Sequence, residues 1–185
     1  NILERASARE TSARTAVGGV LDNFLQCFNI DIISHVIQLG NIKCNCFENN
    51  FSFSKLKEKV YDSPLHCFNK EKEKKMMKYI DQMKEEGNTL GGVIEIRTTN
   101  IIPGLGSHTQ WNRRLDSKIA AALMSIPAIK GVEIGTAFQN AASTGSAVHD
   151  EIYYNKQKGF YHKTNRAGGL EGGITNGEAL IVRIA

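Results

Sequence analysis

The sequence is poor in the residues that cross-link a chain or bind a metal ion. It has four cysteines, at positions 27, 44, 46 and 67, with no C-x-x-C pair and no histidine at a ligand spacing. Cys44 and Cys46 are too close together to be the usual pair of zinc ligands. The pattern argues against a disulfide framework and against a metal site. Reduced thiols are typical of cytoplasmic proteins, so we expect a cytoplasmic protein.

Long hydrophobic runs and a strong charge of one sign are also absent. No apolar segment approaches the roughly 20 residues of a transmembrane helix, and no signal-peptide pattern opens the chain. We therefore predict no membrane partner. The net charge of +4 suits a small anionic ligand as well as nucleic acid. Acids alternate with the lysines of residues 55–84, so this lysine-rich segment is explained by a solvated helix face. Nucleic acid therefore ranks last among the expected partners.

The remaining composition is that of one globular domain. With 185 residues, 41% hydrophobic and 23% charged, the chain is long enough for a single domain over residues 1–185. Periodicity and turn residues predict alternating helices and strands, and hence one α/β or α+β unit. The expected helices cover 7–28, two segments within 54–87, and 116–126; the expected strands cover 30–39, 90–99, 131–135, 152–154, 160–162 and 179–185. Asn69 is expected to cap the second helix within 54–87, and Met76 to face the core. The strands 152–154 and 160–162 are expected to form a hairpin.

The first helix has a capping signal and an apolar stripe. Ser7 and Glu10 have the spacing of a capping box, in which each side chain accepts the other residue's N–H. Two glycines lie within the helix, and each costs about 1 kcal/mol of helix stability relative to alanine. Such a cost indicates a place where another backbone packs closely. The apolar stripe consists of Val17, Leu21, Phe24 and Phe28.

Three arginines surround this helix start. Helix N-termini favour anions, and guanidinium groups bind phosphate or carboxylate through paired hydrogen bonds. Arg5 and Arg9 can reach the same space as the N–H groups, which predicts an anion site. The alternative is that they pair with acids such as Glu4 and Glu10. Arg14 lies a turn further on, where a salt bridge or an interface is expected.

Two further stretches could bind a ligand. Residues 165–177 are rich in glycine, as in phosphate-binding loops, but no Walker or dinucleotide motif is present, so a tight structural loop is the alternative. In residues 104–135, Trp111 and the pair Arg113 and Arg114 could hold a planar anion, and Asp116 is expected to cap a helix. His108 and the other histidines have no partner that indicates catalysis.

Three stretches in this order resemble the chorismate synthase family. ERASARETSARTAVGG, from Glu4, resembles the family's arginine–serine signature. GLGSHTQWNRRLDSKIAAALMSIPAIKGVEIG, from Gly104, resembles its central segment. GSAVHDEIYY and KTNRAGGLEGGITNG, from Gly145 and Lys163, resemble its glycine-rich loop. The resemblance covers essentially the whole chain.

The resemblance implies an unusual lyase. Members of the family convert 5-enolpyruvylshikimate 3-phosphate to chorismate by 1,4-elimination of phosphate, with reduced FMN and no net redox change. The expected ligands are therefore reduced FMN and a small anionic substrate of the shikimate pathway. The resemblance also implies an α+β fold, a β-α-β sandwich with helices between antiparallel sheets, and a homotetramer.

Site residues follow from the positions that match the family. Pro127 departs from the asparagine of many members and has neither an N–H nor a side-chain donor. No residue matches a catalytic acid or base. The resemblance implies FMN contacts at Arg5, Ala6, Ser7, Pro127, Ala128 and Gly172, and a substrate contact at Arg9.

Several family motifs do not occur in residues 1–185. These are a GxSHG-type motif, a second functional histidine, a KPxxT stretch and an RSD motif. The chain thus corresponds to the central portion of a chorismate synthase, and we expect these residues alone to be insufficient for turnover. The alternative function is a non-catalytic binding or assembly domain that keeps the fold.

Overall fold

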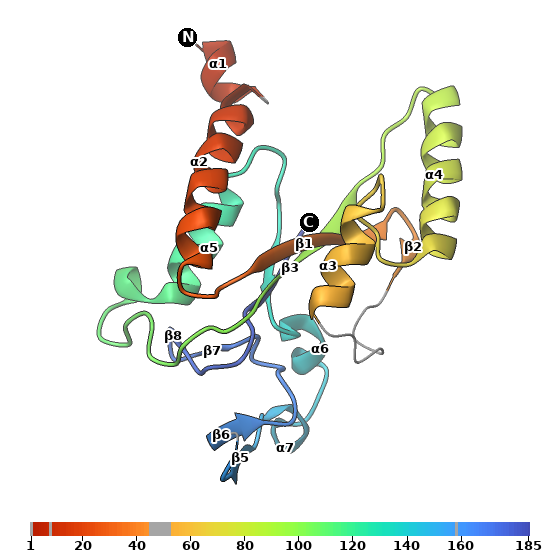
Figure 1. Ribbon diagram of the computed structural model, residues 1–185. Helices are drawn as coiled ribbons and strands as arrows, with labels where there is room; N and C mark the ends of the chain where they lie inside the picture. The colour runs from red at the N-terminus through yellow and green to blue at the C-terminus, as the bar shows by residue number, and fades with distance from the viewer. Residues whose placement is uncertain (1, 8, 45–52, 158) are drawn as a thin grey trace. The chain divides into compact units, whose positions relative to one another are not determined.

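The computed structural model describes residues 2–7, 9–44, 53–157 and 159–185 (Figure 1). The chain forms two compact units, Asn1–Ile32 together with Arg97–Ile184, and Ile33–Ile96. Each unit is built from helices and antiparallel strands. The expectation of one domain over residues 1–185 stays a prediction. Cys46, part of the closely spaced cysteine pair, lies outside the described residues.

The unit Ile33–Ile96 is built on three neighbouring strands in the order β2-β1-β3. Strand β1 (Ile32–Leu39) turns at Gly40, whose φ of 53° suits glycine, and pairs with β2 (Ile42–Lys43) in antiparallel register. Strand β3 (Gly92–Thr98) completes the set. The strands predicted at 30–39 and 90–99 are confirmed within two residues at each end.

Two helices supply the core of this unit. Helix α3 (Phe53–Tyr61) contributes Leu56 and Val60, and helix α4 (Lys70–Glu85) contributes Met76, which is fully buried. These side chains form one cluster with Ile33 of β1. The prediction that Met76 faces the core is confirmed. Apolar burial of this kind is the main force that holds helices on a sheet.

Asn69 begins helix α4 as predicted. Its side-chain oxygen accepts hydrogen bonds from the N–H groups of Glu71 and Lys72, each at 3.0 Å. These are two of the N–H groups that a helix leaves unpaired at its start. At the other end Gly87, with φ of 65°, follows the helix.

Polar groups are also buried in this unit. His35 of β1 and Glu95 of β3 are at most 1% exposed, and His35 Nε2 lies 3.2 Å from Glu95 Oε1. The thiols of Cys44 and Cys67 are buried, and the hydrogen bond with Cys44 together with burial raises the pKa of Cys67. A thiol with a raised pKa is unreactive, which suits Cys67 to a structural role. Both cysteines belong to the core cluster.

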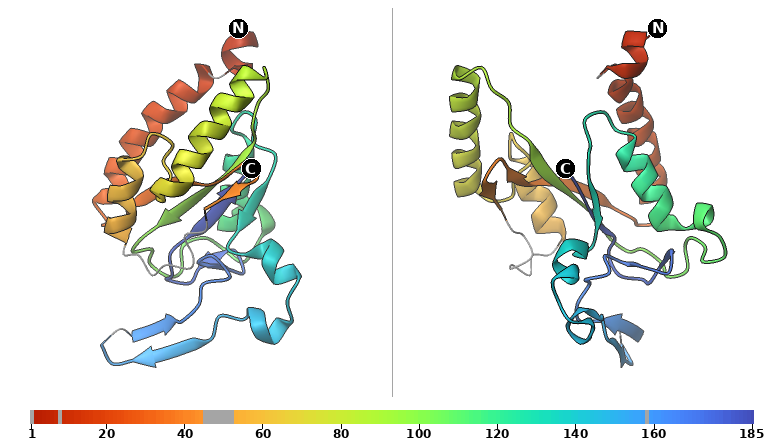
Figure 2. Two further views of the ribbon diagram at one scale, coloured as in Figure 1. Left: turned by 90° about the vertical axis from the view of Figure 1, so that its right-hand side faces the viewer. Right: turned by 180° about the vertical axis from the view of Figure 1, so that it is seen from behind.

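The other unit has two long helices that lie side by side and run in opposite directions (Figures 1 and 2). They are α2 (Arg9–Gln26) and α5 (Leu115–Met124). Where the structure describes the chain, no helix is long and apolar enough to span a membrane. The short helices of this unit are α1 (Ile2–Ala6), η1 (Trp111–Arg113), α6 (Ala137–Ala141) and α7 (Gly145–Val148).

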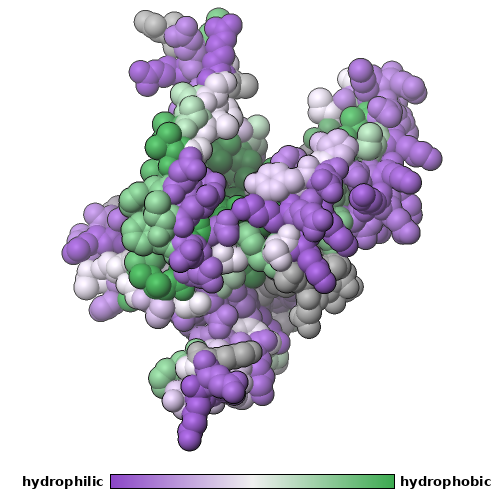
Figure 3. All heavy atoms as spheres, viewed as in Figure 1, coloured by the Kyte–Doolittle hydropathy of each residue, from purple (hydrophilic) through white to green (hydrophobic). Residues whose placement is uncertain are grey.

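Helix α2 exposes its apolar stripe. Figure 3 shows hydrophobic residues gathered along this helix. A Cβ atom added at Gly18 or Gly19 would meet nothing within 4 Å. Within the described residues, no backbone packs against these two glycines. The stripe consists of Val17, Leu21 and Phe24 on the helix and Phe28 just beyond its end at Gln26, each more than half exposed.

The strands of this unit form antiparallel pairs. β4 (Val132–Ile134) pairs with β9 (Ile181–Ile184), and β5 (Ile152–Asn155) with β6 (Gly159–His162), both antiparallel. The predicted hairpin is therefore confirmed. β7 (Leu170–Glu171) and β8 (Ile174–Thr175) form a third antiparallel pair.

Candidate functional site

The arginine–serine segment forms the junction between α1 and α2. The Ser7 hydroxyl accepts a hydrogen bond from Arg9 N at 3.3 Å. The return bond of the predicted capping box is not formed, because Ser7 N donates to Leu3 O and the Glu10 carboxylate binds Arg14. The capping-box prediction is therefore wrong: α1 precedes Ser7 and already occupies its N–H. Helix α2 begins at Arg9, two residues after the predicted start.

Arg5 and Arg9 are exposed, and neither forms an ion pair within the described part of the chain. The alternative was that an acid such as Glu10 pairs with Arg5 or Arg9. The Glu10 carboxylate pairs with Arg14 instead, at 2.9 Å. Two uncompensated guanidinium groups therefore flank the start of α2. Such groups attract phosphates and carboxylates.

Arg14 connects this helix to the end of α5. Besides its predicted salt bridge, it donates from Nη1 to the Ser125 hydroxyl at 2.7 Å. Ser125 is the C-cap of α5 and lies two residues before Pro127. Pro127 and Ala128 are both exposed, and Ala128 has a φ of 71°. This conformation is strained for alanine, and such strain is enriched in ligand-binding segments.

The other end of α5 is fixed by an ion pair. Arg114 is the N-cap, and its guanidinium binds the Asp116 carboxylate through Nε at 3.0 Å and through Nη2. The prediction that Asp116 caps this helix is wrong, because Asp116 lies in the first turn. Its hydrogen bond from Arg114 holds the pKa of Asp116 below its usual value. Arg114 is thereby neutralised and is no longer a free clamp for an anion.

The central segment and the glycine-rich loop, residues 165–177, form one structure. Leu115 N donates to Gly173 O and Gly104 N to Thr175 O, each at 2.9 Å. The Thr175 hydroxyl donates to Ile102 O at 2.7 Å. Two stretches that were separate candidates in the sequence are thus joined at the N-terminal end of α5.

Gly172 and Gly173 form the two-residue turn between β7 and β8. Their φ values of 59° and 86° are those of a type I′ hairpin turn, which accounts for the glycine pair structurally. A Cβ at Gly173 would lie 2.6 Å from Arg114 Cγ, whereas a Cβ at Gly172 would meet nothing within 4 Å. Gly172 is exposed, so a ligand can approach its backbone.

Three of the predicted ligand residues lie toward the two ends of α5. Pro127 and Ala128 follow its C-terminal end, where Arg14 ties it to the helix that carries Arg9. Gly172 lies at its N-terminal end, and a ten-residue helix is about 15 Å long. Among the described residues, no hydrogen bond joins Gly172 to the other predicted FMN residues.

Other candidates from the sequence do not form a reaction centre. His108 and Trp111 are exposed. Among the described residues, no group of three or more His, Cys, Asp or Glu side chains could hold a metal ion.

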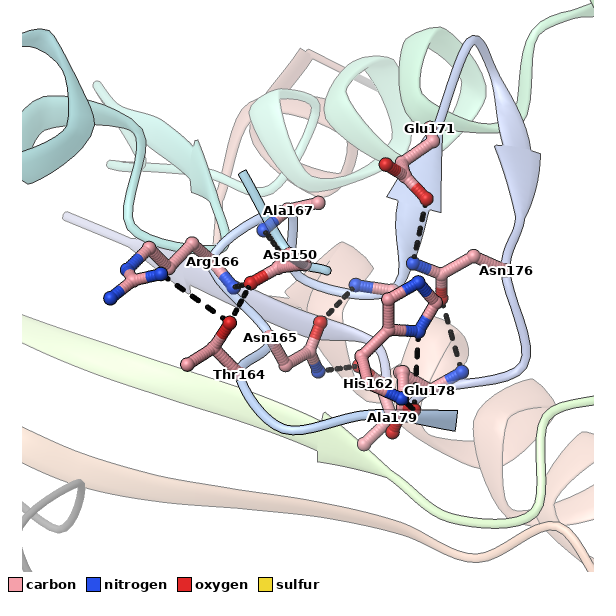
Figure 4. A network of polar contacts seen from close by, with 11 residues as sticks. Asp150, His162, Thr164, Asn165, Arg166, Ala167, Glu171, Asn176, Glu178 and Ala179 are labelled. Carbon is pink, nitrogen blue, oxygen red and sulfur yellow. Dashed lines mark hydrogen bonds and ion pairs between the residues drawn. The ribbon is translucent and has the colours of Figure 1, made fainter. Parts of the chain in front are cut away.

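Sequence reasoning missed a polar network around the glycine-rich loop, shown in Figure 4. Asp150 binds the start of the loop, and Glu178, just beyond its end, accepts a hydrogen bond from His162 N at 2.8 Å. The available signal was the place of Asp150, two residues before the predicted hairpin. Its carboxylate had no identifiable partner in the sequence.

Comparison with known proteins settles the family. A family model described as chorismate synthase matches residues 1–185. The chain belongs to the chorismate synthase family. The predicted family is thereby confirmed, and the relatives are named for an enzyme.

Individual relatives agree with this assignment. Over the whole of this chain, identity is 54% to the chorismate synthase of Desulforamulus reducens and 49% to that of Thermus thermophilus. These matches cover 48% and 47% of the two relatives. The chain thus spans about half the length of the curated chorismate synthases it matches.

A solved structure supports the fold. A crystal structure of a chorismate synthase superposes with a TM-score of 0.93 and 49% identity. The match covers 100% of this chain and 57% of that one. The predicted α+β fold of the chorismate synthase type is confirmed.

Proposed function

We propose that the protein carrying this chain is a chorismate synthase, which eliminates phosphate from 5-enolpyruvylshikimate 3-phosphate to form chorismate without net redox change. The observation that carries the proposal is the family match over all 185 residues. The uncompensated Arg5 and Arg9 support it, because the substrate has a phosphate and two carboxylates.

Reduced FMN is the proposed cofactor. The groups present are compatible with it: a guanidinium without an ion pair at Arg5, a hydroxyl at Ser7, and open space beside Gly172. Pro127 can offer only its carbonyl and its ring. The proposed FMN residues are Arg5, Ala6, Ser7, Pro127, Ala128 and Gly172.

In this proposal the chain binds and orients charged groups. Reduced FMN would supply reversible electron donation while the phosphate leaves. Arg9 binds an anionic group of the substrate, and Arg5 compensates a phosphate charge near the start of α2. Fixed cations stabilise charge that develops on a leaving phosphate, because they need no reorganisation during the reaction.

The proposal includes an oligomeric state and a cellular location. We expect a homotetramer in the cytoplasm. The exposed stripe on α2 supports burial against further protein, because contiguous apolar surface favours association.

The test is phosphate release by the intact protein with photoreduced FMN and 5-enolpyruvylshikimate 3-phosphate under anaerobic conditions. We expect release of phosphate and formation of chorismate. Arg9→Ala should weaken substrate binding roughly 10- to 100-fold, the range of a hydrogen bond to a charged group.

Arg14→Ala is the matched control, since Arg14 lies on the same helix but is engaged by Glu10 and Ser125. It should change the substrate affinity by less than about twofold. FMN binding without phosphate release would indicate the alternative, a non-catalytic binding domain. Equal loss of affinity in both variants would show that Arg9 has a structural role.

A further inference from the structure

The glycine-rich loop and the β5–β6 hairpin are tied together by two carboxylates. In the hairpin, Ile152 pairs with His162, so Asp150 and Thr164 stand two residues outside the last pair. Asp150 reaches from the hairpin to the start of the loop. Glu178 reaches back to His162, with Oε1 accepting from its N–H at 2.8 Å and lying 3.3 Å from Nδ1.

Asp150 makes the denser set of contacts. Its Oδ1 accepts from the Thr164 hydroxyl at 2.5 Å and from Arg166 N at 3.0 Å, and its Oδ2 accepts from Ala167 N at 2.8 Å (Figure 4). Two successive backbone N–H groups are thus held by one side chain. A carboxylate suits three donors because it only accepts, through two oxygens.

The backbone held by Asp150 leads directly into the close-packed part of the loop. Arg166 O accepts from Thr136 N at 3.0 Å. Gly168 then packs so tightly that an added Cβ would lie 2.4 Å from Gly135 N. The Asn165 side chain accepts from Gly169 N at 2.7 Å and donates to Ala179 O at 2.8 Å. The path from residue 164 to Gly169 is therefore fixed before the chain reaches β7.

We propose that Asp150 is a positioning residue for FMN binding, because its carboxylate holds the glycine-rich loop in the conformation that presents Gly172. This inference rests on the proposed FMN site. Asp150 itself does not contact the cofactor. Its effect passes through the backbone of Arg166 and Ala167 into the strand pair that ends in the Gly172 turn.

The experiment compares Asp150→Asn with the unsubstituted intact protein. Asparagine keeps the size but replaces one oxygen with an NH₂ group that faces backbone donors. We expect the Kd for FMN, measured by fluorescence titration, to rise roughly 10- to 100-fold. We also expect faster hydrogen exchange at the amides of Arg166 and Ala167. A purely structural role would lower the fraction of protein that binds and leave the Kd of that fraction unchanged.

Glu151→Gln is the matched control. It changes the charge by the same amount one residue away, but Glu151 is exposed and binds the Tyr153 hydroxyl within the hairpin. Its Kd for FMN should stay within about twofold. Should Asp150→Asn fail to fold, Thr164→Val removes one of the three donors to Asp150, together with a long hydrogen bond from Arg166 Nη1, and the Kd should rise roughly 2- to 10-fold.

The outcomes separate the two proposals. Normal FMN binding by the unsubstituted protein, with an unchanged Kd in Asp150→Asn or in the substitute variant, overturns the role of Asp150 alone. Absence of FMN binding by the unsubstituted protein overturns the proposed cofactor and this inference with it. A raised Kd with faster exchange at residues 166 and 167, and neither change in Glu151→Gln, supports the positioning role.

Discussion

Arg14 and Ser125 are 111 residues apart in the sequence and are joined by a hydrogen bond of 2.7 Å. This bond connects the helix that follows the arginine–serine segment to the end of α5, two residues before Pro127. The same guanidinium also pairs with Glu10. A single side chain thus relates two segments that carry proposed FMN residues.

Arg14→Ala should lower the free energy of unfolding by about 1 kcal/mol or less, because the ion pair is partly exposed and solvent screens it. The midpoint of urea unfolding measures the change. Arg9→Ala, which removes a guanidinium without an ion pair in the described chain, should stay within about 0.5 kcal/mol. A larger loss in Arg9→Ala than in Arg14→Ala would contradict the role of the Arg14–Ser125 bond.

Gly135→Ala should destabilise the protein by about 3 kcal/mol or more. The φ of Gly135 is 61°, and an added Cβ would lie 2.1 Å from Arg166 O. Gly87 is the control, since its φ is 65° and an added Cβ would meet nothing within 4 Å. Gly87→Ala isolates the backbone strain and should cost about 1 kcal/mol. Similar thermal midpoints for the two variants would mean that the loop yields to the new methyl group.

Glu95→Ala should destabilise the protein by about 3 kcal/mol or more, because it leaves His35 buried without this partner. Glu95→Gln keeps a side-chain oxygen near His35 and should lower the free energy of unfolding by less than Glu95→Ala does. Urea unfolding followed by circular dichroism compares them with Glu58→Ala, an exposed position on α3, which should change stability by less than about 0.5 kcal/mol. A small loss in Glu95→Ala would refute the importance of the buried pair.

Asp150 should make stability depend on pH in the acid range. Burial raises the pKa of its carboxyl, but the hydrogen bonds from Arg166 N, the Thr164 hydroxyl and Ala167 N outweigh burial and leave the pKa below its usual value. The unfolded chain has a pKa of about 3.9 for aspartate. A carboxyl with a lower pKa in the folded state stabilises fully above the unfolded pKa, and this stability is lost as the pH falls through the folded pKa.

The difference in unfolding free energy between the unsubstituted protein and Asp150→Asn should therefore be constant near neutral pH and shrink below about pH 4. Urea unfolding at a series of pH values measures it. A difference that grows on acidification would mean that the carboxyl is protonated in the folded state.

Local signals were enough for much of the secondary structure. Asn69 caps α4 because its side chain reaches N–H groups two and three residues away, and a short-range contact of this kind can be predicted from spacing. The β5–β6 hairpin could also be predicted from short-range signals, because its two strands are close together in the sequence. The prediction failed at Ser7, whose N–H is already bound within α1, and at Asp116, which lies in the first turn of α5 and is bound by Arg114.

The arrangement of the candidate site depends on long-range contacts that the spacing of residues in the sequence does not reveal. The glycine-rich loop could be singled out by composition, but its union with the central segment rests on bonds such as Leu115 N to Gly173 O. The sequence also showed that Asp150 precedes a hairpin, without showing that its carboxylate turns back to Arg166 N.

By itself, the sequence determined the family and the longer helices and strands, because these follow from motifs and from periodicity within a few residues. Only the three-dimensional structure decided which arginines form no ion pair within the described residues, since an acid such as Glu10 has more than one arginine within reach in sequence and side-chain orientation selects Arg14. It alone also decided that Asp150 holds the glycine-rich loop, because that contact needs the hairpin between them to bring both ends together.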